Sequence, residues 1–80
     1  MIIRLIEVFS SDNDEFICCF NLESFWNSEN LRTIVDINSN DPEIYDIYRL
    51  DDSQVALLGG EHLLRLNNGK VECFLSYISE

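Results

Sequence analysis

The sequence has few basic residues for its length. Lys and Arg number 5 against 15 Asp and Glu, which gives a formal net charge of −10 over 80 residues. A surface with this charge repels phosphate groups, so the composition argues against direct binding of nucleic acid or of anionic lipid headgroups. The same field attracts basic surfaces and speeds encounter with them. The simplest alternative is that the charge only keeps a small domain in solution.

Histidine is scarce, and cysteine occurs in a pattern that limits its chemistry. His62 is the only histidine, so a nucleophilic triad would have to be built around it, and we expect it to have a structural or surface role. Cys18, Cys19 and Cys73 cannot all pair, and adjacent thiols on a strand point to opposite faces. The sequence therefore predicts reduced thiols, no metal, no cofactor and no catalytic residues, as expected of a protein that is not an enzyme.

No apolar run is long enough to cross a membrane. The N-terminal run IIRLIEVF is interrupted by Arg4 and Glu7 and has no small-residue cleavage pattern, so it resembles neither a signal peptide nor a membrane span. We therefore expect a cytoplasmic protein that does not bind membranes. Hydrophobic residues make up 46% of the chain, which is enough for one core, and we expect residues 1–80 to form a single domain.

An N-terminal β-hairpin is predicted by two apolar runs. Residues 2–9 and 16–20 are rich in β-branched and aromatic residues, and the polar cluster SSDNDE between them is typical of a turn. Because side chains alternate along a strand, Phe16, Cys18 and Phe20 should share one face.

A second hairpin is predicted at the C-terminal end. The runs HLLRL and VECFLSYI flank Asn67-Asn68-Gly69, and Asn-Gly is favoured where two turn residues need positive φ. In the last strand one face is uniformly apolar or aromatic, through Val71, Cys73, Leu75 and Tyr77, and the other is mixed.

Two short helices are expected between the hairpins. Apolar residues recur at helical spacing within residues 24–36, with Ser28 as a possible cap, and Asp51 with Gln54 forms a D-x-x-Q capping box before a helix that Gly59-Gly60 ends. The stretch EIYDIYRL at residues 43–50 favours a helical turn or an irregular segment over a strand. The predicted fold is α+β, with two antiparallel hairpins forming one sheet and two short helices packed on it.

The acidic segment, residues 36–52 (DINSNDPEIYDIYRLDD), gathers six carboxylates and two tyrosines around one arginine, a local formal charge of −5. Tyrosines beside acids are typical of surfaces that bind Lys and Arg side chains. Each residue also has a structural alternative: Tyr48 can belong to the core, Asp51 can cap a helix, and Asp41 can shape the turn before Pro42. For the segment as a whole we predict a partner-binding surface formed by Asp36, Asp41, Glu43, Tyr45, Asp46, Tyr48, Asp51 and Asp52.

The same segment has oxygen-bearing side chains at alternate positions, as calcium-binding loops do. An EF-hand loop that began at Asp36 would need glycine at its sixth position and glutamate at its twelfth, where this sequence has Asp41 and Ile47. The pattern therefore does not predict a calcium site.

The layout of the chain resembles small bacterial immunity proteins of contact-dependent growth inhibition and related polymorphic toxin systems. The resemblance spans most of the chain, from RLIEVF at Arg4 to Phe9 through NDPEIYDIY at Asn40 to Tyr48 and the capped helix, and D-P-x-x-Y-x-x-Y is its most specific motif. It implies a cytosolic protein that binds and neutralises one cognate toxin domain, often a nuclease with a basic active-site surface.

Charge and resemblance together predict a toxin-neutralising immunity protein, monomeric or in a 1:1 heterodimer, whose acidic, tyrosine-containing surface blocks a basic toxin domain. One alternative is a phage-encoded acidic inhibitor that mimics nucleic acid, of the anti-restriction or anti-CRISPR type. A further alternative, a small enzyme or ligand-binding domain, predicts a concave pocket that gathers His62 with a carboxylate or a thiol.

Overall fold

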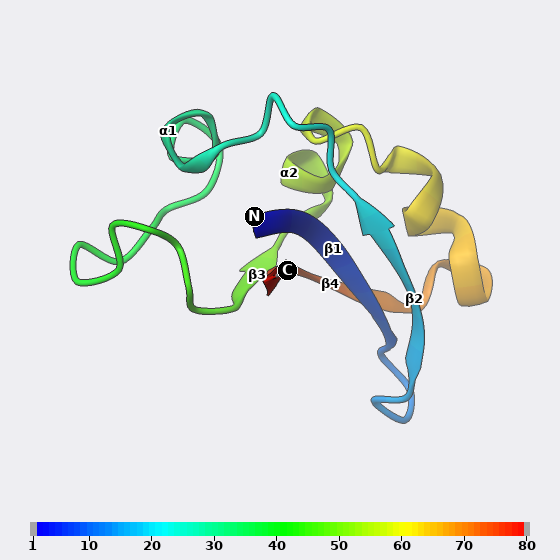
Figure 1. The fold of residues 1–80 in the computed structure, drawn as a ribbon. Helices are drawn as coiled ribbons and strands as arrows, with labels where there is room; N and C mark the ends of the chain where they lie inside the picture. The colour runs from blue at the N-terminus through cyan, green and yellow to red at the C-terminus, as the bar shows by residue number, and fades with distance from the viewer. Residues whose placement is uncertain (1, 80) are drawn as a thin grey trace.

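The computed structural model describes residues 2–79 and contains one antiparallel sheet with helices on one side of it (Figure 1). The strands are β1 (Ile2–Ser10), β2 (Phe16–Asn21), β3 (Tyr48–Leu50) and β4 (Val71–Ser79), in the sheet order β2-β1-β4-β3. The helices are α1 (Ser28–Leu31), α2 (Asp52–Leu57) and the 3₁₀ helix η1 (Glu61–Gly69). The α+β architecture predicted from the sequence is confirmed.

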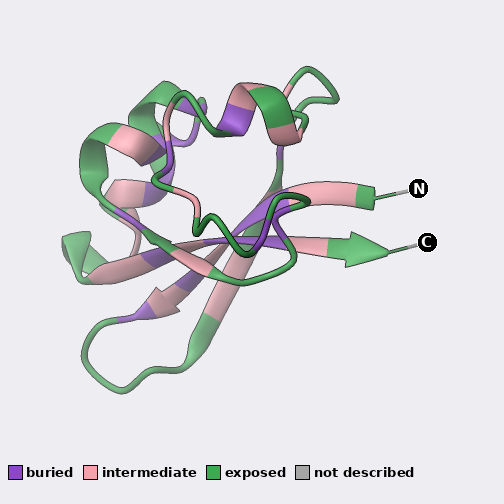
Figure 2. Ribbon diagram, turned by 90° about the vertical axis from the view of Figure 1, so that its left-hand side faces the viewer, coloured by how far each residue is buried: buried purple, intermediate pink, exposed green. Residues whose placement is uncertain are grey.

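The core lies between the helices and one face of the two central strands. Ile6 of β1 is paired with Leu75 of β4, Val8 is paired with Cys73, and all four side chains are buried. Because paired residues share a face of a sheet, this face meets the buried helical side chains, among them Val55. Figure 2 shows the buried residues mainly in the strands and helices, while the connecting loops are largely exposed.

Within residues 2–79 no helix covers the opposite face of β1 and β4, and we call this the open face (Figure 1). Phe9 on β1 and Phe74 on β4 belong to it, since their strand neighbours Val8 and Cys73 point into the core. Both phenylalanines are half-buried.

The N-terminal hairpin is confirmed, but one detail of its register was predicted wrongly. The pairing runs from Val8 with Cys18 to Phe9 with Phe16, which leaves Ile17 as the extra residue of a β-bulge. The bulge places Phe16 beside Phe9, with ring centroids 5.6 Å apart, instead of on the face shared by Cys18 and Phe20.

The predicted C-terminal hairpin is wrong. Residues 62–66 belong to η1, and β4 is paired on one side with β1 and on the other with β3. A strand at residues 62–66 would therefore have no adjacent edge of β4 to occupy. The turn itself has the predicted backbone, because Asn67, Asn68 and Gly69 all have positive φ, but it joins a helix to a strand.

Both predicted helices are present, but their ends were predicted with different accuracy. The capping box of α2 is present, since the Asp51 carboxylate accepts from the Gln54 N–H and the Gln54 side chain accepts from the Asp51 N–H, both at 2.8 Å. Gly59 follows the helix with φ of +87°. Helix α1 is a single turn within residues 24–36, and its cap is Asn27 instead of Ser28.

Residues 48–50 were predicted to be non-strand, and this was wrong. They form β3, in which Tyr48 is paired with Leu75 and Leu50 with Cys73. The spacing of three between Ile44, Ile47 and Leu50 suggested a helix and concealed the alternation of Tyr48 and Leu50 along a strand. Ile44 belongs to the preceding loop, although its side chain is in the core.

Candidate protein-interaction surface

The first part of the acidic segment, residues 36–47, is a loop without regular secondary structure that connects the α1 region to β3. We call it the acidic loop; it is the green loop that extends to the left in Figure 1. The remaining residues of the acidic segment form β3 and the start of α2. The segment thus borders both the edge of the sheet and the end of one helix.

Asp41 is the central hydrogen-bond acceptor of the acidic loop. One carboxylate oxygen accepts from the Tyr45 N–H at 2.8 Å, and the other accepts from the Asp46 N–H at 2.9 Å and from the Tyr48 hydroxyl at 2.7 Å. The bond from the Tyr45 N–H is the largest cause that lowers the pKa of Asp41 below its ordinary value, so the carboxylate stays charged. Asp41 is buried, and its hydrogen bonds join two parts of the acidic segment.

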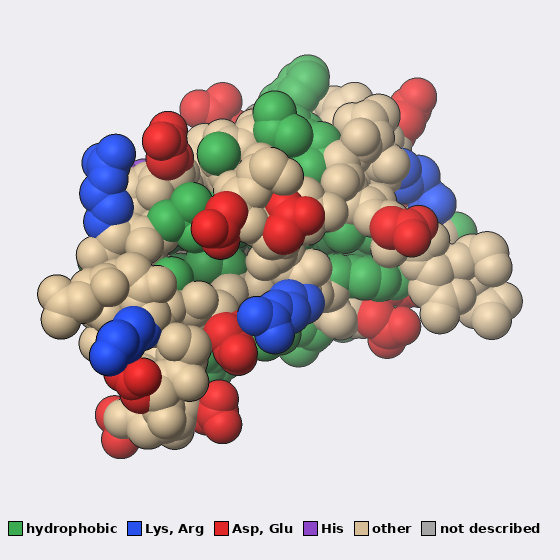
Figure 3. All heavy atoms as spheres, turned by 180° about the vertical axis from the view of Figure 1, so that it is seen from behind, with side chains coloured by type: hydrophobic (Ala, Val, Ile, Leu, Met, Phe, Trp, Pro, Cys, Tyr) green, Lys and Arg blue, Asp and Glu red, His purple; other side chains and the backbone are tan. Residues whose placement is uncertain are grey.

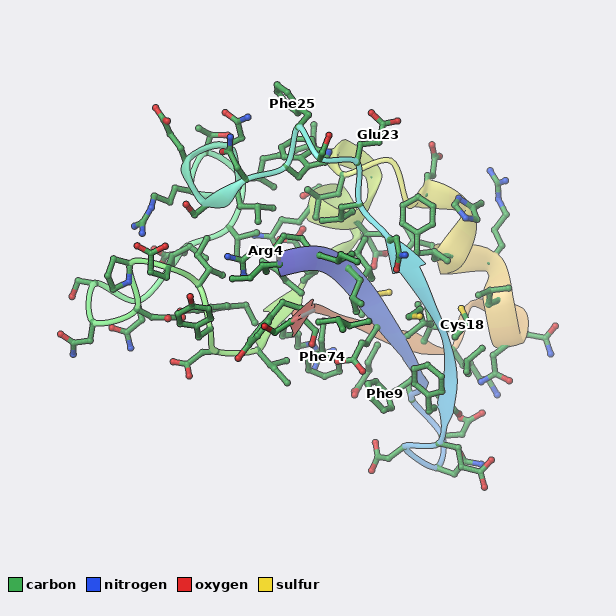
Figure 4. The ribbon with its side chains drawn as sticks, in the orientation of Figure 1. Arg4, Phe9, Cys18, Glu23, Phe25 and Phe74 are labelled. Carbon is green, nitrogen blue, oxygen red and sulfur yellow. The ribbon has the colours of Figure 1, made fainter. Side chains whose placement is uncertain are left out.

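Two arginines outside the acidic segment bind the loop through its carbonyl groups. Arg4 of β1 donates to the carbonyl oxygen of Ile44 and, at 2.6 Å, to that of Glu43, and Figure 4 shows Arg4 directed from β1 toward this loop. Arg32 donates to the carbonyl oxygen of Pro42. Because these guanidinium groups bond to backbone oxygens, they fix the loop without forming ion pairs with its carboxylates.

The backbone of the acidic loop is strained at one buried residue. Ile44 is 1% exposed and has φ of +59°, a conformation that β-branched residues rarely adopt. Such a residue persists only where its surroundings hold it. Here the burial of its side chain in the core, its N–H bond to the Asp41 carbonyl and its carbonyl bond from Arg4 hold it together.

The two tyrosines of the acidic segment have different roles. Tyr48 is half-buried, and its hydroxyl accepts from the Asn38 N–H at 3.3 Å while donating to Asp41; burial is the first cause that raises the pKa of Tyr48. Tyr45 is 50% exposed, and its ring lies against Tyr77 with centroids 5.3 Å apart. Tyr45 therefore presents a supported aromatic surface to solvent.

The predicted partner-binding residues separate into two groups. One group is held in local structure: Asp41 and Tyr48 in the loop network, and Asp51, whose carboxylate accepts from the Gln54 N–H and the Ser53 hydroxyl. The Gln54 bond is the main cause that lowers the pKa of Asp51. The other residues are exposed to solvent, as Asp51 also is; they are Asp36, Glu43, Tyr45, Asp46 and Asp52.

A cleft of about 670 Å³ adjoins the end of the acidic segment, between the start of α2 and strands β3 and β4. Its lining includes the carboxylates of Asp51, Asp52 and Glu72, and Glu72 lies 3.6 Å from the guanidinium of Arg49. Arg49 is largely exposed, so this pair adds little to stability. Figure 3 shows acidic side chains spread over this side of the molecule, with hydrophobic side chains between them.

Glu72 is a member of this surface that the sequence did not reveal. It lies on β4, twenty residues after Asp52, and reaches the cleft because β3 pairs with β4. The pairing of β3 with β4 cannot be predicted from the residues near Glu72 in the sequence.

His62 lies away from these carboxylates. Its ring packs edge-on against Phe20, with centroids 5.1 Å apart, and it lines none of the three clefts described for residues 2–79. Within the same residues no three His, Cys, Asp or Glu side chains are grouped to hold a metal ion. Each helix of this part of the chain is too short or too polar to cross a bilayer.

Comparison with known proteins places the chain in a family. Residues 3–77 match the family described as Domain of unknown function (DUF7683), a range that includes almost the whole sheet and all the helices. No curated protein and no solved structure matches the chain. The match extends over most of the sequence, and the chain therefore belongs to the DUF7683 family.

Proposed function

We propose that the protein is a toxin-neutralising immunity protein, which binds a cognate basic toxin domain through the acidic loop and the cleft beside α2 and so blocks the toxin's active site. The observation that carries the proposal is the combination of a fixed backbone and unneutralised charge in the acidic loop. Asp41, Arg4 and Arg32 hold the backbone, while Asp36, Glu43 and Asp46 remain exposed.

A fixed loop favours tight binding because its ordering does not have to occur during association. Loops that become ordered in a complex lose conformational entropy, and that loss weakens affinity. Three side chains already hold this loop in the unbound protein through bonds to its own backbone. The exposed carboxylates are thus available to a partner at positions that the fold sets in advance.

The acidic surface is complementary to a partner protein that itself binds phosphates. A nuclease needs a basic cleft for its substrate, and the carboxylates of this protein would stand where the substrate's phosphates lie. Charge would set the rate of encounter, and the supported ring of Tyr45 would add contact area that slows dissociation. From the resemblance to immunity proteins we infer that the partner is a toxin domain and that the complex forms in the cytosol. We expect one copy of each protein in the complex.

The test is a pull-down from the native cytosol with the tagged full-length protein, washed at about 150 mM salt, where the Debye length is roughly 8 Å. The proposal predicts recovery of one basic protein in 1:1 ratio, encoded beside this protein's gene. Recovery of a restriction or CRISPR component would instead assign the protein to the phage-encoded mimics. Recovery of no protein at all would contradict both.

Two charge-reversed baits make the test specific to the loop. Glu43→Lys/Asp46→Lys changes the acidic loop, and Asp12→Lys/Glu61→Lys makes the same change in net charge at two other exposed acids. We expect the loop variant to associate with the recovered partner at least tenfold more slowly, within the range that electrostatic steering spans. Equal slowing in both variants would mean that net charge, and not the acidic loop, attracts the partner.

A further inference from the structure

The open face of the sheet contains an apolar groove, which shares only Glu72 with the lining of the cleft beside α2. The groove has a volume of about 340 Å³. We call its three apolar lining residues, Phe9, Ile47 and Phe74, the floor, and its three acidic lining residues, Glu7, Asp14 and Glu72, the rim. Figure 4 labels Phe9 and Phe74, which lie close to each other on the side of the sheet away from the helices.

The floor of the groove is held by aromatic contacts. The Phe9 ring meets the Phe74 ring edge-to-face with centroids 5.7 Å apart, and it meets the Phe16 ring in the same way at 5.6 Å. Phe16 reaches this position only because of the bulge at Ile17. Ile47, just before β3, is 60% exposed, so the floor is both preformed and open to solvent.

The rim of the groove is acidic, and this determines which occupants fit. Glu72 lies near Arg49, but no ion pair is described for Glu7 or Asp14 within residues 2–79. A second copy of the chain would bring the same acidic rim against itself, and an anionic membrane would meet the same repulsion. A protein segment with basic residues around an apolar side chain complements both the floor and the rim.

We infer that this groove is a docking site for a basic amphipathic segment of a partner protein. One aromatic or aliphatic anchor of the segment enters among Phe9, Ile47 and Phe74, and its neighbouring Lys or Arg side chains lie beside Glu7 and Asp14. Interfaces commonly concentrate their binding energy in such an anchor with a polar rim around it. The inference goes beyond the proposed function, because it holds whether or not the acidic loop binds a toxin.

Labelled synthetic peptides of 12 residues test the groove directly on the full-length protein. The first peptide has a central Trp among Lys, Arg and Ser, the second has Ser in place of Trp, and the third has Glu in place of the basic residues. Fluorescence anisotropy should show saturable binding of the first peptide and at least tenfold weaker binding of the other two. Equal binding of the first two peptides would reduce the interaction to general charge attraction and overturn the inference.

Variants of the protein locate the bound peptide. Phe74→Ala and Ile47→Ser should each weaken binding of the first peptide about tenfold, and Glu7→Gln should weaken it less. Ile47 is the safer of the two apolar changes, since it is 60% exposed and its replacement leaves the core intact. The matched controls are Phe25→Ala, at an aromatic residue 62% exposed, and Glu23→Gln; Figure 4 shows both on the other side of the molecule. Controls that weaken binding as much as the groove variants would contradict the site.

Three further measurements test whether the peptide binds elsewhere and whether the groove has another occupant. The Asp36→Lys/Glu43→Lys protein, changed at two exposed acids of the acidic loop that do not line the groove, should bind the first peptide as the unaltered protein does. A loss of binding would place the peptide on the acidic loop instead. Analytical ultracentrifugation over a range of concentrations should show no dimer whose formation depends on Ile47, as judged by comparison with Ile47→Asp.

Vesicles containing phosphatidylserine should not bind the protein. A dimer or vesicle binding through this face would give the groove a different occupant and overturn the inference.

Discussion

Different forces hold the covered face of the sheet, which packs against the helices, and the acidic loop. The covered face is held by apolar burial, with Ile6, Val8 and Leu75 fully removed from water. The acidic loop buries Ile44 and packs the half-buried Ile37 against the core, and it otherwise depends on hydrogen bonds to Asp41 and from Arg4 and Arg32. Core stability should therefore depend on side-chain volume, whereas the shape of the proposed binding surface should depend on charge and pH.

The largest expected effect is on the covered face. Leu75→Ala removes a side chain that is 0% exposed at the centre of the sheet, and changes of this kind cost about 2 to 5 kcal/mol. A domain of this size has a stability of roughly 3 to 5 kcal/mol from its core, so the variant should be largely unfolded. Urea denaturation followed by circular dichroism measures this, and Leu57→Ala, at 64% exposure, should stay within about 0.5 kcal/mol of the unaltered protein. Equal losses in the two variants would place the core elsewhere.

The next effect concerns the carboxylate of the acidic loop. Asp41→Asn should be more destabilising than the same kind of change at any exposed acid of the loop, because three donors lose a charged acceptor. The folded-state pKa of Asp41 is lowered from its ordinary value of 3.8, so its contribution is fully present above that value. It is lost as the pH falls through 3.8 and then through the lower folded-state pKa.

The pH dependence of Asp41→Asn is measurable by urea unfolding at a series of pH values from 7 down to 3. The difference between the unaltered protein and the variant should be greatest at neutral pH and shrink in acid. Asp36→Asn, which also removes one carboxylate but at an exposed acid of the same loop, is the control. A difference that stays constant down to pH 3 would show that Asp41 does not hold the loop through its charge.

A smaller effect is expected from the arginine that joins the loop to the sheet. Arg4→Met keeps an unbranched apolar chain but removes the donors to the carbonyl groups of Glu43 and Ile44. Leaving a partly buried acceptor without its donor costs about 1 to 3 kcal/mol. Thermal unfolding should show the loss, and Arg65→Met, at an exposed arginine of η1, should not. An unchanged midpoint for Arg4→Met would mean that the loop is held without β1.

The smallest effect should come from the hydroxyl of Tyr48. Tyr48→Phe keeps the ring but removes the donor to Asp41 and the acceptor of the Asn38 N–H, so it should lower the unfolding midpoint by less than Asp41→Asn does. Tyr45→Phe is the matched control, because no hydrogen bond is described for the Tyr45 hydroxyl. If Tyr45→Phe lowers the midpoint more than Tyr48→Phe, the division between a structural and an exposed tyrosine is wrong.

Features that depend on neighbouring residues could be predicted from the sequence. The capping box at Asp51 and Gln54, the stop at Gly59 and the positive φ of Asn67 and Asn68 all follow from side chains within a few positions. The N-terminal hairpin and the single sheet follow from the alternation of apolar residues.

Features that depend on distant pairing could not be predicted. The η1 helix replaces a predicted strand because β1 and β3 already occupy both edges of β4, which no local pattern contains. The same reason hid the contribution of Glu72 to the cleft and of Phe74 to the groove. In the acidic segment, composition predicted a surface, but only the hydrogen bonds distinguish Asp41, which holds the loop, from Asp46, which is exposed.

Amide hydrogen exchange of Tyr45 and Asp46 in the unbound protein is the first measurement to make, because the proposed surface depends on a loop that is formed before any partner arrives. Both amides donate to Asp41. We predict that they exchange far more slowly than the amide of Glu43, which has no described acceptor, and that Asp41→Asn removes this protection. Exchange of Tyr45 and Asp46 as fast as that of Glu43 would contradict a preformed loop, since the carboxylates would then have no fixed positions to offer.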